Sequence, residues 1–354
     1  MRAAPVLLAL SLAGCQETTF HIKQDPVTPP QPASIEGRVC DPSGRTWLAD
    51  ALIYTYLKTD EGHIYDTRTT YSDRNGYWLL DELPMGFEYD IYIQYGSQIL
   101  EQHTVWVGDG EHFVIDQPDC FDPLDVNVAV ITGDYDDFQL VLTNMGFANY
   151  QLVDGLTGSE LTDFLMDPAQ LEPYDIIFFN GGHLEEDILY DTDGTDTSGV
   201  STQIVQNVVD YVSNGGTVYA SDWAYDVVER GWPTRVNWVG DDNIPDSAQK
   251  GEYDYVSAAV SDSALAEFLG KDHVDIEFDL PVWPVIDSAD GSVSVHLSSN
   301  VEYREGQETI TLPARPILVS FSSGEGKVVF ASFRVAKNAT QDMVLSLQYM
   351  MYNL

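Results

Sequence analysis

Basic residues are scarce in this chain of 354 residues. Lysine and arginine together number 16 against 57 aspartates and glutamates, which gives a formal net charge of −41. Nucleic-acid binding needs a basic surface, because contacts to phosphate supply much of the affinity. The same shortage excludes a polybasic contact with anionic lipid. A hydrophobic share of 44% and an aromatic share of 12% are typical of globular proteins. The composition therefore predicts an acidic globular protein with no nucleic-acid partner.

Long apolar runs are also missing, and the nearest approach to one is the first segment, MRAAPVLLALSLAGC. Arg2 precedes an apolar stretch that is too short to span a bilayer but is typical of an export signal. The residues Leu12–Cys15, LAGC, resemble the bacterial lipobox. That resemblance implies cleavage before Cys15 and lipidation of its thiol. Ordinary signal cleavage nearby, with Cys15 incidental, is the alternative.

The lipobox resemblance also implies a location. Residues 1–14 would form a lipoprotein signal peptide, and residues 15–34, which are polar and rich in proline, would form a lipidated tether. Multiple acyl chains hold a protein stably at a membrane. We therefore expect a lipid-anchored protein of the cell envelope whose membrane partner is the outer membrane or cell surface rather than the inner membrane.

Cysteine is scarce too, since the chain contains only Cys15, Cys40 and Cys120. No CxxC pair is present, and no cysteine and histidine spacing fits a zinc site. In an exported chain, the two remaining thiols favour one disulfide between Cys40 and Cys120. Two free buried thiols are the alternative.

Residues 35–120 are predicted to be all-β. Short alternating stretches such as ALIYTYLKT and YDIYIQYG are separated by glycine, asparagine, aspartate and proline turns. The segment resembles the carboxypeptidase regulatory-like domain, which implies a prealbumin-like β-sandwich that usually serves as an accessory module. A Cys40–Cys120 bridge would tie the ends of such a domain together. The residues that carry the resemblance are Gly37, Asp41, Gly44, Ala51, Asp73, Gly76, Tyr77, Leu79, Leu83, Pro84, Gly86 and Tyr89.

Residues 125–354 alternate between apolar strands and helices. Continuous apolar runs such as VNVAVIT and YDIIFFN are typical of strands in a parallel sheet that is covered on both faces. Their alternation with helical patterns predicts a doubly wound α/β domain of the flavodoxin-like class. Residues from about 235 to 315 are less regular and are expected to form a β-rich insertion or a set of edge strands.

Ligands bind such sheets at the carboxyl ends of the strands. The loops GDYDDF, NGGHLEED, SDWAYD and FRVAKN should meet there, and this arrangement resembles the class I glutamine amidotransferase-like superfamily, including its ThuA-like branch. An active member carries cysteine at the nucleophile elbow, where this chain has Asp222, and Arg334 stands where some relatives carry histidine. The resemblance therefore implies a catalytically degenerate domain that is not an enzyme. The candidate ligand pocket comprises Asp134, Asp136, Gly181, Gly182, His183, Asp222, Trp223 and Arg334.

Asp222 itself admits three interpretations. Aspartate is a favoured N-cap residue, and Asp222 directly precedes a predicted helix, so a helix cap or structural turn is the favoured one. A contact with a ligand or cation is the second. A covalent carboxylate nucleophile is the third.

The acidic loop DTDGTDTSG contains weak candidates for calcium ligands at Asp191, Asp193 and Asp196. The glycine and glutamate of an EF-hand are absent at the required positions, so a solvated loop is the alternative to a non-EF calcium site. His183, which is followed by acidic residues, fits no named metal motif. We expect no cofactor, with Ca²⁺ as the possible exception.

These observations predict a non-catalytic cell-envelope lipoprotein that acts as a binding or structural module. Aromatic residues beside carboxylates, around Trp223, are compatible with an envelope polysaccharide as the partner, and a protein partner is the other candidate. The alternative function is an envelope hydrolase that uses Asp222 or a bound cation at the carboxyl end of the sheet.

Overall fold

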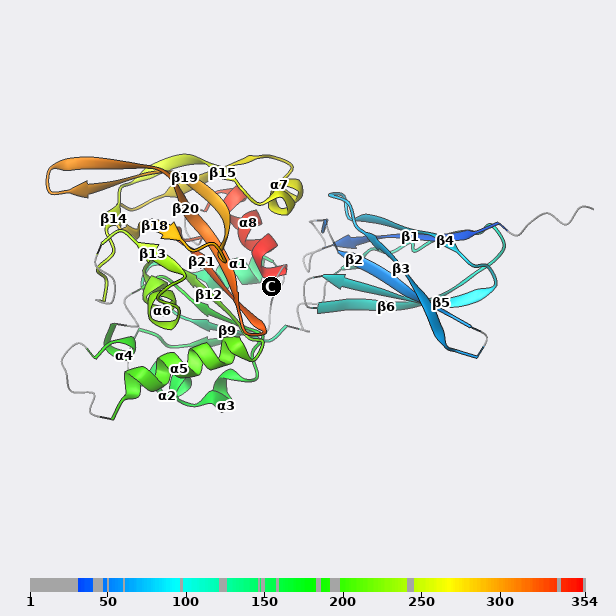
Figure 1. Cartoon of the computed structure of the whole chain (residues 1–354), viewed down its shortest axis with the longest axis horizontal. Helices are drawn as coiled ribbons and strands as arrows, with labels where there is room; N and C mark the ends of the chain where they lie inside the picture. Colours follow the sequence, from blue (N-terminus) through cyan, green and yellow to red (C-terminus); the bar gives the residue numbers. More distant parts are fainter. Residues whose placement is uncertain are drawn as a thin grey trace, which may run out of the picture.

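The structure of the protein is a computed structural model. It describes residues 31–40, 47–49, 51–59, 61–95, 98–120, 126–145, 147, 150–156, 159–182, 186–191, 198–240, 245–335 and 339–352. The chain is β-rich and is built from several sheets, as the strand patterns predicted. Figure 1 shows the first eight strands gathered at one side of the molecule and the strands from β9 onward, with the long helices, at the other.

Two four-stranded sheets form the part that precedes residue 121. Their inward residues alternate along the strands, as Ile35, Val39, Ile53 and Ile91 do, and pack into one apolar core. The first sheet contains β4 (Tyr77–Leu83), β1 (Ala33–Cys40), β7 (His112–Val114) and β8 (Asp119–Cys120); the second contains β3 (Ile64–Tyr71), β2 (Leu52–Lys58), β5 (Phe87–Tyr95) and β6 (Gln98–Val107).

The predicted disulfide between Cys40 and Cys120 is confirmed. Strands β1 and β8 pair in parallel with these two residues in register, and their Cα atoms lie 4.4 Å apart. The bridge therefore closes a loop of 80 residues that contains most of both sheets. Cys15 lies outside the described residues.

The second part is organised around an 11-stranded sheet. Five of its strands are parallel, in the order β10, β9, β11, β12 and β21. Every residue of β9, β11 and β12 is buried, which explains why the sequences of β9 and β11 are continuously apolar. The bounds are β10 (Tyr150–Val153), β9 (Val128–Ile131), β11 (Ile176–Phe179), β12 (Thr217–Ser221) and β21 (Gly326–Ala331).

Helices cover both faces of these parallel strands (Figure 1). Alternate residues of β11 enter two separate cores: Phe178 packs with Phe138 of α1 on one face, and Phe179 packs in the core that includes Ile204 of α5 on the other. The first face carries α1 (Phe138–Asn144) and α8 (Gln341–Tyr352), and the second carries α2 (Glu160–Met166), α5 (Val200–Ser213) and α6 (Tyr225–Gly231); the short helices α3 (Pro168–Leu171) and α4 (Glu186–Leu189) accompany them.

The region expected to be irregular extends the same sheet with antiparallel strands. Strand β20 pairs with β21 on one side and with β19 on the other, so the insertion is continuous with the parallel strands rather than a separate module. Its elements are β13 (Val236–Trp238), β14 (Lys250–Gly251), β15 (Asp254–Val260), α7 (Ser263–Leu269), β16 (His273–Phe278), β17 (Trp283–Pro284), β18 (Ile286–Ala289), β19 (Ser294–Glu305) and β20 (Glu308–Ser323). Within the described part of the chain, no helix is long and apolar enough to cross a membrane.

Candidate functional site

The loops that follow β9, β11 and β12 come into close contact at the carboxyl edge of the parallel strands. The backbone N–H of Tyr135 donates to the carbonyl of Gly181 over 3.1 Å. A Cβ atom added at Gly133 would lie 2.3 Å from the carbonyl oxygen of Gly181, and one added at Gly181 would lie 2.9 Å from the Cβ of Asp222. Only glycine permits such approaches, so the Gly-Gly turn brings the predicted loops together.

Asp222 occupies a sharp turn between β12 and a short 3-10 helix, η2 (Asp222–Ala224), which leads into α6. Its φ angle is +50°, in the left-handed region that a nucleophile elbow also requires, and 5% of its surface is exposed. Its Oδ1 atom is buried and has no hydrogen-bond partner among the described residues. The turn therefore has the elbow character that the sequence predicted, with a carboxyl group at its apex.

The prediction that Asp222 is a helix N-cap is wrong. The N-cap position of η2 is Ser221, whose φ is −130° and whose backbone is extended, and that of α6 is Ala224. Neither cap carries a side-chain hydrogen bond to the helix that follows. Asp222 lies inside the 3-10 turn with a positive φ, whereas an N-cap residue precedes the helix with non-helical, usually extended, angles.

Burial dominates the electrostatics of Asp222. Loss of hydration raises the pKa of this carboxyl well above its ordinary value, because the charged form is the one that burial disfavours. The Arg334 guanidinium opposes this shift, and the neighbouring carboxylates of Asp136 and Asp279 add to it. Burial therefore favours the neutral form of the Asp222 side chain, which has one O–H donor and acceptor oxygens.

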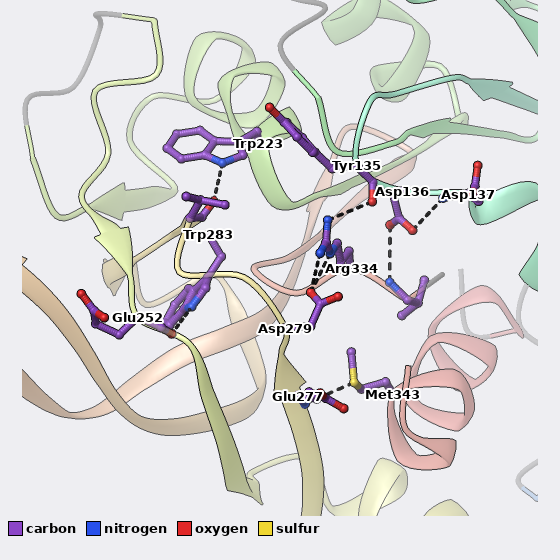
Figure 2. Close-up of polar contacts among 12 residues, drawn as sticks. Tyr135, Asp136, Asp137, Trp223, Glu252, Glu277, Asp279, Trp283, Arg334 and Met343 are labelled. Carbon is purple, nitrogen blue, oxygen red and sulfur yellow. Dashed lines mark hydrogen bonds and ion pairs between the residues drawn. The ribbon is translucent and has the colours of Figure 1, made fainter. Parts of the chain in front are cut away.

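Asp136, from the loop after β9, is a second buried carboxyl in the same site and is 3% exposed. Its Oδ2 accepts a hydrogen bond from the Ser221 hydroxyl at 3.2 Å and a longer one from the Val335 N–H at 3.4 Å, and its Oδ1 accepts from the Asp137 N–H at 3.0 Å. Burial raises its pKa to about 6, and these hydrogen bonds limit the shift. Figure 2 shows Asp136 beside Arg334 at this edge.

Arg334 follows β21 and joins three loops. Its Nε and Nη2 donate to Oδ1 of Asp279 at 2.8 and 2.6 Å, and its Nη1 donates to the carbonyl of Tyr135 at 3.1 Å (Figure 2). Both charged side chains of the ion pair are mostly buried, at 16% and 14% exposure. Arg334 therefore supplies a fixed positive charge at this edge of the sheet.

Asp222 and Arg334 border a small pocket with an empty volume of about 230 Å³, which includes space open to solvent. The room that it offers to water is about that of one molecule. Apolar and acidic side chains from the β16–β17 segment complete the wall, and the rings of Phe278 and Trp283 stack with centroids 3.9 Å apart. The lining residues are Asp222, Glu277, Phe278, Asp279, Leu280, Val282, Trp283, Ser332, Phe333 and Arg334.

The other predicted pocket residues lie in different settings. Trp223 is 2% exposed, its Nε1 donates to the carbonyl of Val282, and the Lys250 ammonium lies 5.2 Å from its ring centroid. Gly182 packs against the backbone of Asp134, whose side chain is exposed. His183 lies outside the described residues, so its relation to Asp222 stays a prediction.

Metal binding was predicted for the acidic loop after α4. Asp191 is exposed, and Asp193 and Asp196 lie outside the described residues. Among the residues that the structure describes, no group of three or more histidine, cysteine, aspartate or glutamate side chains is arranged to hold a metal ion.

Sequence patterns missed Asp279, Trp283 and the rest of the wall formed by the β16–β17 segment. Asp279 is 55 positions from its partner Arg334 in the chain, and Trp283 is 31 positions from its partner Glu252. They come from the region expected to be irregular, and no local motif marks them. An unpaired arginine in a predicted apolar hairpin was the one available signal that a distant carboxylate partner was needed.

No protein-family model and no curated protein matches the chain. Among solved structures, it is similar to two cytoplasmic proteins of Salmonella typhimurium, each at 12% identity, with TM-scores of 0.40 and 0.39; the alignments cover 64% of this chain and 97% and 95% of theirs. It is also similar to the β-galactosidase of Rahnella sp. R3 at 11% identity and a TM-score of 0.36, over 63% of this chain and 31% of that enzyme. Likenesses at this level assign neither a family nor an activity.

Proposed function

We propose that the protein is a cell-envelope lipoprotein that binds a hydroxyl-rich ligand, such as an envelope polysaccharide, beside Asp222. In this proposal the second part is an amidotransferase-like domain without its nucleophile. Across the sheet, the parallel strands stand in the order second, first, third, fourth and fifth, when they are numbered by their place in the chain. This is the flavodoxin-like order, and it supports that assignment. The first part is a carboxypeptidase regulatory-like sandwich, which the two sheets joined by Cys40–Cys120 support.

The observation that carries the proposal is the unpartnered Oδ1 of Asp222 at the wall of the pocket. A buried polar atom without a partner costs about 1–3 kcal/mol, and a ligand hydroxyl that bonds to it would recover this energy. A neutral carboxyl can donate and accept at once, which matches a hydroxyl group. The space suits a single hydroxyl, and the Trp283 and Phe278 rings, which are 4% and 3% exposed, stack on each other in its wall.

A hydrolase at the same site is the second candidate. Two buried carboxyls with raised pKa values, Asp136 and Asp222, interact electrostatically there, and such pairs serve as acid and base in glycosidases. Among the described residues, however, no histidine or other base is hydrogen-bonded to Asp222, and Asp136 already accepts a hydrogen bond from the Ser221 hydroxyl. Binding therefore needs fewer additional groups than catalysis does.

The test is calorimetric titration of the full chain with soluble peptidoglycan fragments and neutral hexose oligosaccharides. We expect Asp222→Ala to weaken binding by about 5- to 150-fold, the equivalent of one buried hydrogen bond. Asp222→Asn should retain most of the affinity, because its amide also donates and accepts. Glu267→Gln, an exposed acid on α7, is the control. Equal affinities of wild type and Asp222→Ala would refute this site, and product release from the glycans by wild type would favour the hydrolase.

Membrane anchoring is tested separately. We propose that Cys15 carries the lipid, and we expect metabolic labelling with radioactive palmitate to mark the wild-type chain and not the Cys15→Ser variant. Unchanged labelling of the variant would contradict lipidation at this residue.

A further inference from the structure

A second polar cluster lies away from the Asp222 pocket, where β19 and β20 are covered by α8. The Nδ1 atom of His296 is 2.7 Å from Oδ2 of Asp262, and its Nε2 atom is 2.7 Å from the hydroxyl oxygen of Ser320. His296 and Ser320 are 7% and 6% exposed. One imidazole thus joins a carboxylate and a hydroxyl through its two opposite ring nitrogens, which is the arrangement of a serine, histidine and aspartate triad.

The fold explains how these side chains meet. Ser320 lies near the C-terminal end of β20, where it pairs with Ser294 of β19 and Val329 of β21. The register of β19 shifts between Val295 and Leu297, so His296 occupies a β-bulge, and bulges redirect side chains next to active sites. Asp262 precedes α7, and its other oxygen accepts hydrogen bonds from the first turn of that helix.

The contacts determine which nitrogen carries the proton. The hydrogen bond from His296 lowers the pKa of Asp262, so this group is an ionised carboxylate and accepts from Nδ1–H. The lone pair of Nε2 then faces Ser320, whose hydroxyl donates to it. This is the protonation pattern in which histidine can take a proton from serine.

A pocket opens directly beside Ser320, with an empty volume of about 670 Å³ that includes space open to solvent. Asp262, His296 and Ser320 all line it, and Phe321, Tyr349 and Met350 supply apolar wall. Lys327 also lines the pocket and brings an ammonium group to it, whose pKa burial lowers. A network that only satisfied buried polar groups would need neither a cavity at the serine nor a cation beside it.

We propose that Ser320 is the nucleophile of a second site, distinct from the Asp222 pocket, that hydrolyses small carboxylic esters. The Ser320 oxygen forms a bond to the ester carbonyl carbon while its proton moves to Nε2 of His296. The carbon–alkoxy bond then breaks, and the alcohol leaves with that proton. Water attacks the acyl-serine, passes a proton to Nε2 and releases the carboxylic acid, after which Ser320 regains its proton. The Lys327 ammonium is the group that would stabilise the oxyanion.

The experiment treats the full chain with a fluorophosphonate probe, whose phosphorus bonds to an activated serine with loss of fluoride, and maps the modified residue by mass spectrometry. Hydrolysis of p-nitrophenyl acetate is followed in parallel. We expect the label on Ser320 and a loss of ester hydrolysis by at least about 100-fold in Ser320→Ala and His296→Ala. Ser257→Ala, which changes an exposed serine of β15 outside the pocket, should label and hydrolyse as wild type does.

A further variant separates catalysis from folding. Asparagine caps helices as well as aspartate does, so Asp262→Asn should keep the cap of α7, and circular dichroism checks that the variant is folded. Its amide would donate to Nδ1 and place the imidazole proton on Nε2, so labelling should fall by at least about 100-fold. An unlabelled wild-type chain, a label on a residue other than Ser320, or full reactivity in Asp262→Asn would each overturn the proposal. None of these results bears on glycan binding at Asp222.

Discussion

Asp136→Asn tests the electrostatic description of the Asp222 site. Burial raises the pKa of Asp136 from 3.8 to about 6. The unfolded chain therefore ionises this group first as the pH rises, and the folded state loses stability between these two values. A shift of about two units corresponds to about 3 kcal/mol. About 2 kcal/mol of this loss falls between about pH 4.5 and 7.5, and the asparagine variant should lack it.

The assay is urea unfolding of wild type and variant across this pH range, followed by intrinsic fluorescence. The quantity compared is the difference in unfolding free energy between wild type and variant, and only its change with pH is interpreted. An altered hydrogen bond to Ser221 would shift this difference by the same amount at every pH. That difference, wild type minus variant, should fall as the pH rises. Asp262→Asn is the matched control, since its partner His296 lowers the pKa of Asp262 from its ordinary 3.8. The wild type gains stability from this group only as the pH rises toward 3.8, so the difference for this variant should stay nearly flat across the assayed range. A flat or rising difference for Asp136→Asn would refute the assignment.

Two further predictions concern structure away from the carboxyl groups. The double variant Cys40→Ser/Cys120→Ser should lose about 4–5 kcal/mol, because it removes a bridge that spans 80 residues; thermal unfolding with and without reductant measures this, and a wild type insensitive to reductant would contradict it. Gly133→Ala should destabilise the protein by about 1–3 kcal/mol, because its Cβ would lie 2.3 Å from the carbonyl of Gly181. Gly291→Ala, where a Cβ meets nothing within 4 Å, is the control, and equal losses in the two would argue against the close packing of the loops.

The parallel strands could be predicted because the burial of each strand is evident from its own short stretch of sequence. Every residue of β9 and β11 is buried, so both sequences are uninterrupted apolar runs. The antiparallel extension could not be read in this way. Strands β14 and β17 have two residues each, and their pairing depends on neighbours that lie more than 30 positions away in the chain. Periodicity carries no information about such short strands.

The candidate site was predictable in its position and not in its contacts. The glycines around Gly181 indicated where loops approach closely, and the end of β12 indicated a sharp turn. The same local pattern, an aspartate before a helix, is shared by a cap and an elbow, and only the φ of Asp222 separates them. The ion pair between Arg334 and Asp279 needed the tertiary structure, because 55 residues separate its members.

Asp222 combines two features that are unfavourable in the free protein, a left-handed φ and a buried oxygen without a partner. Glycine at this position would remove both, so a turn alone gives no physical reason for a carboxyl group there. Because burial favours the neutral form of the acid, Asp222→Asn keeps the size of that form and its capacity to donate and accept, and it removes ionisation of the carboxyl at high pH. This variant should therefore be more stable than wild type at alkaline pH and still bind the ligand, whereas Asp222→Ala should lose binding. That combination of retained binding and altered pH dependence distinguishes a neutral hydrogen-bonding acid from a charged ligand contact, which the asparagine would abolish.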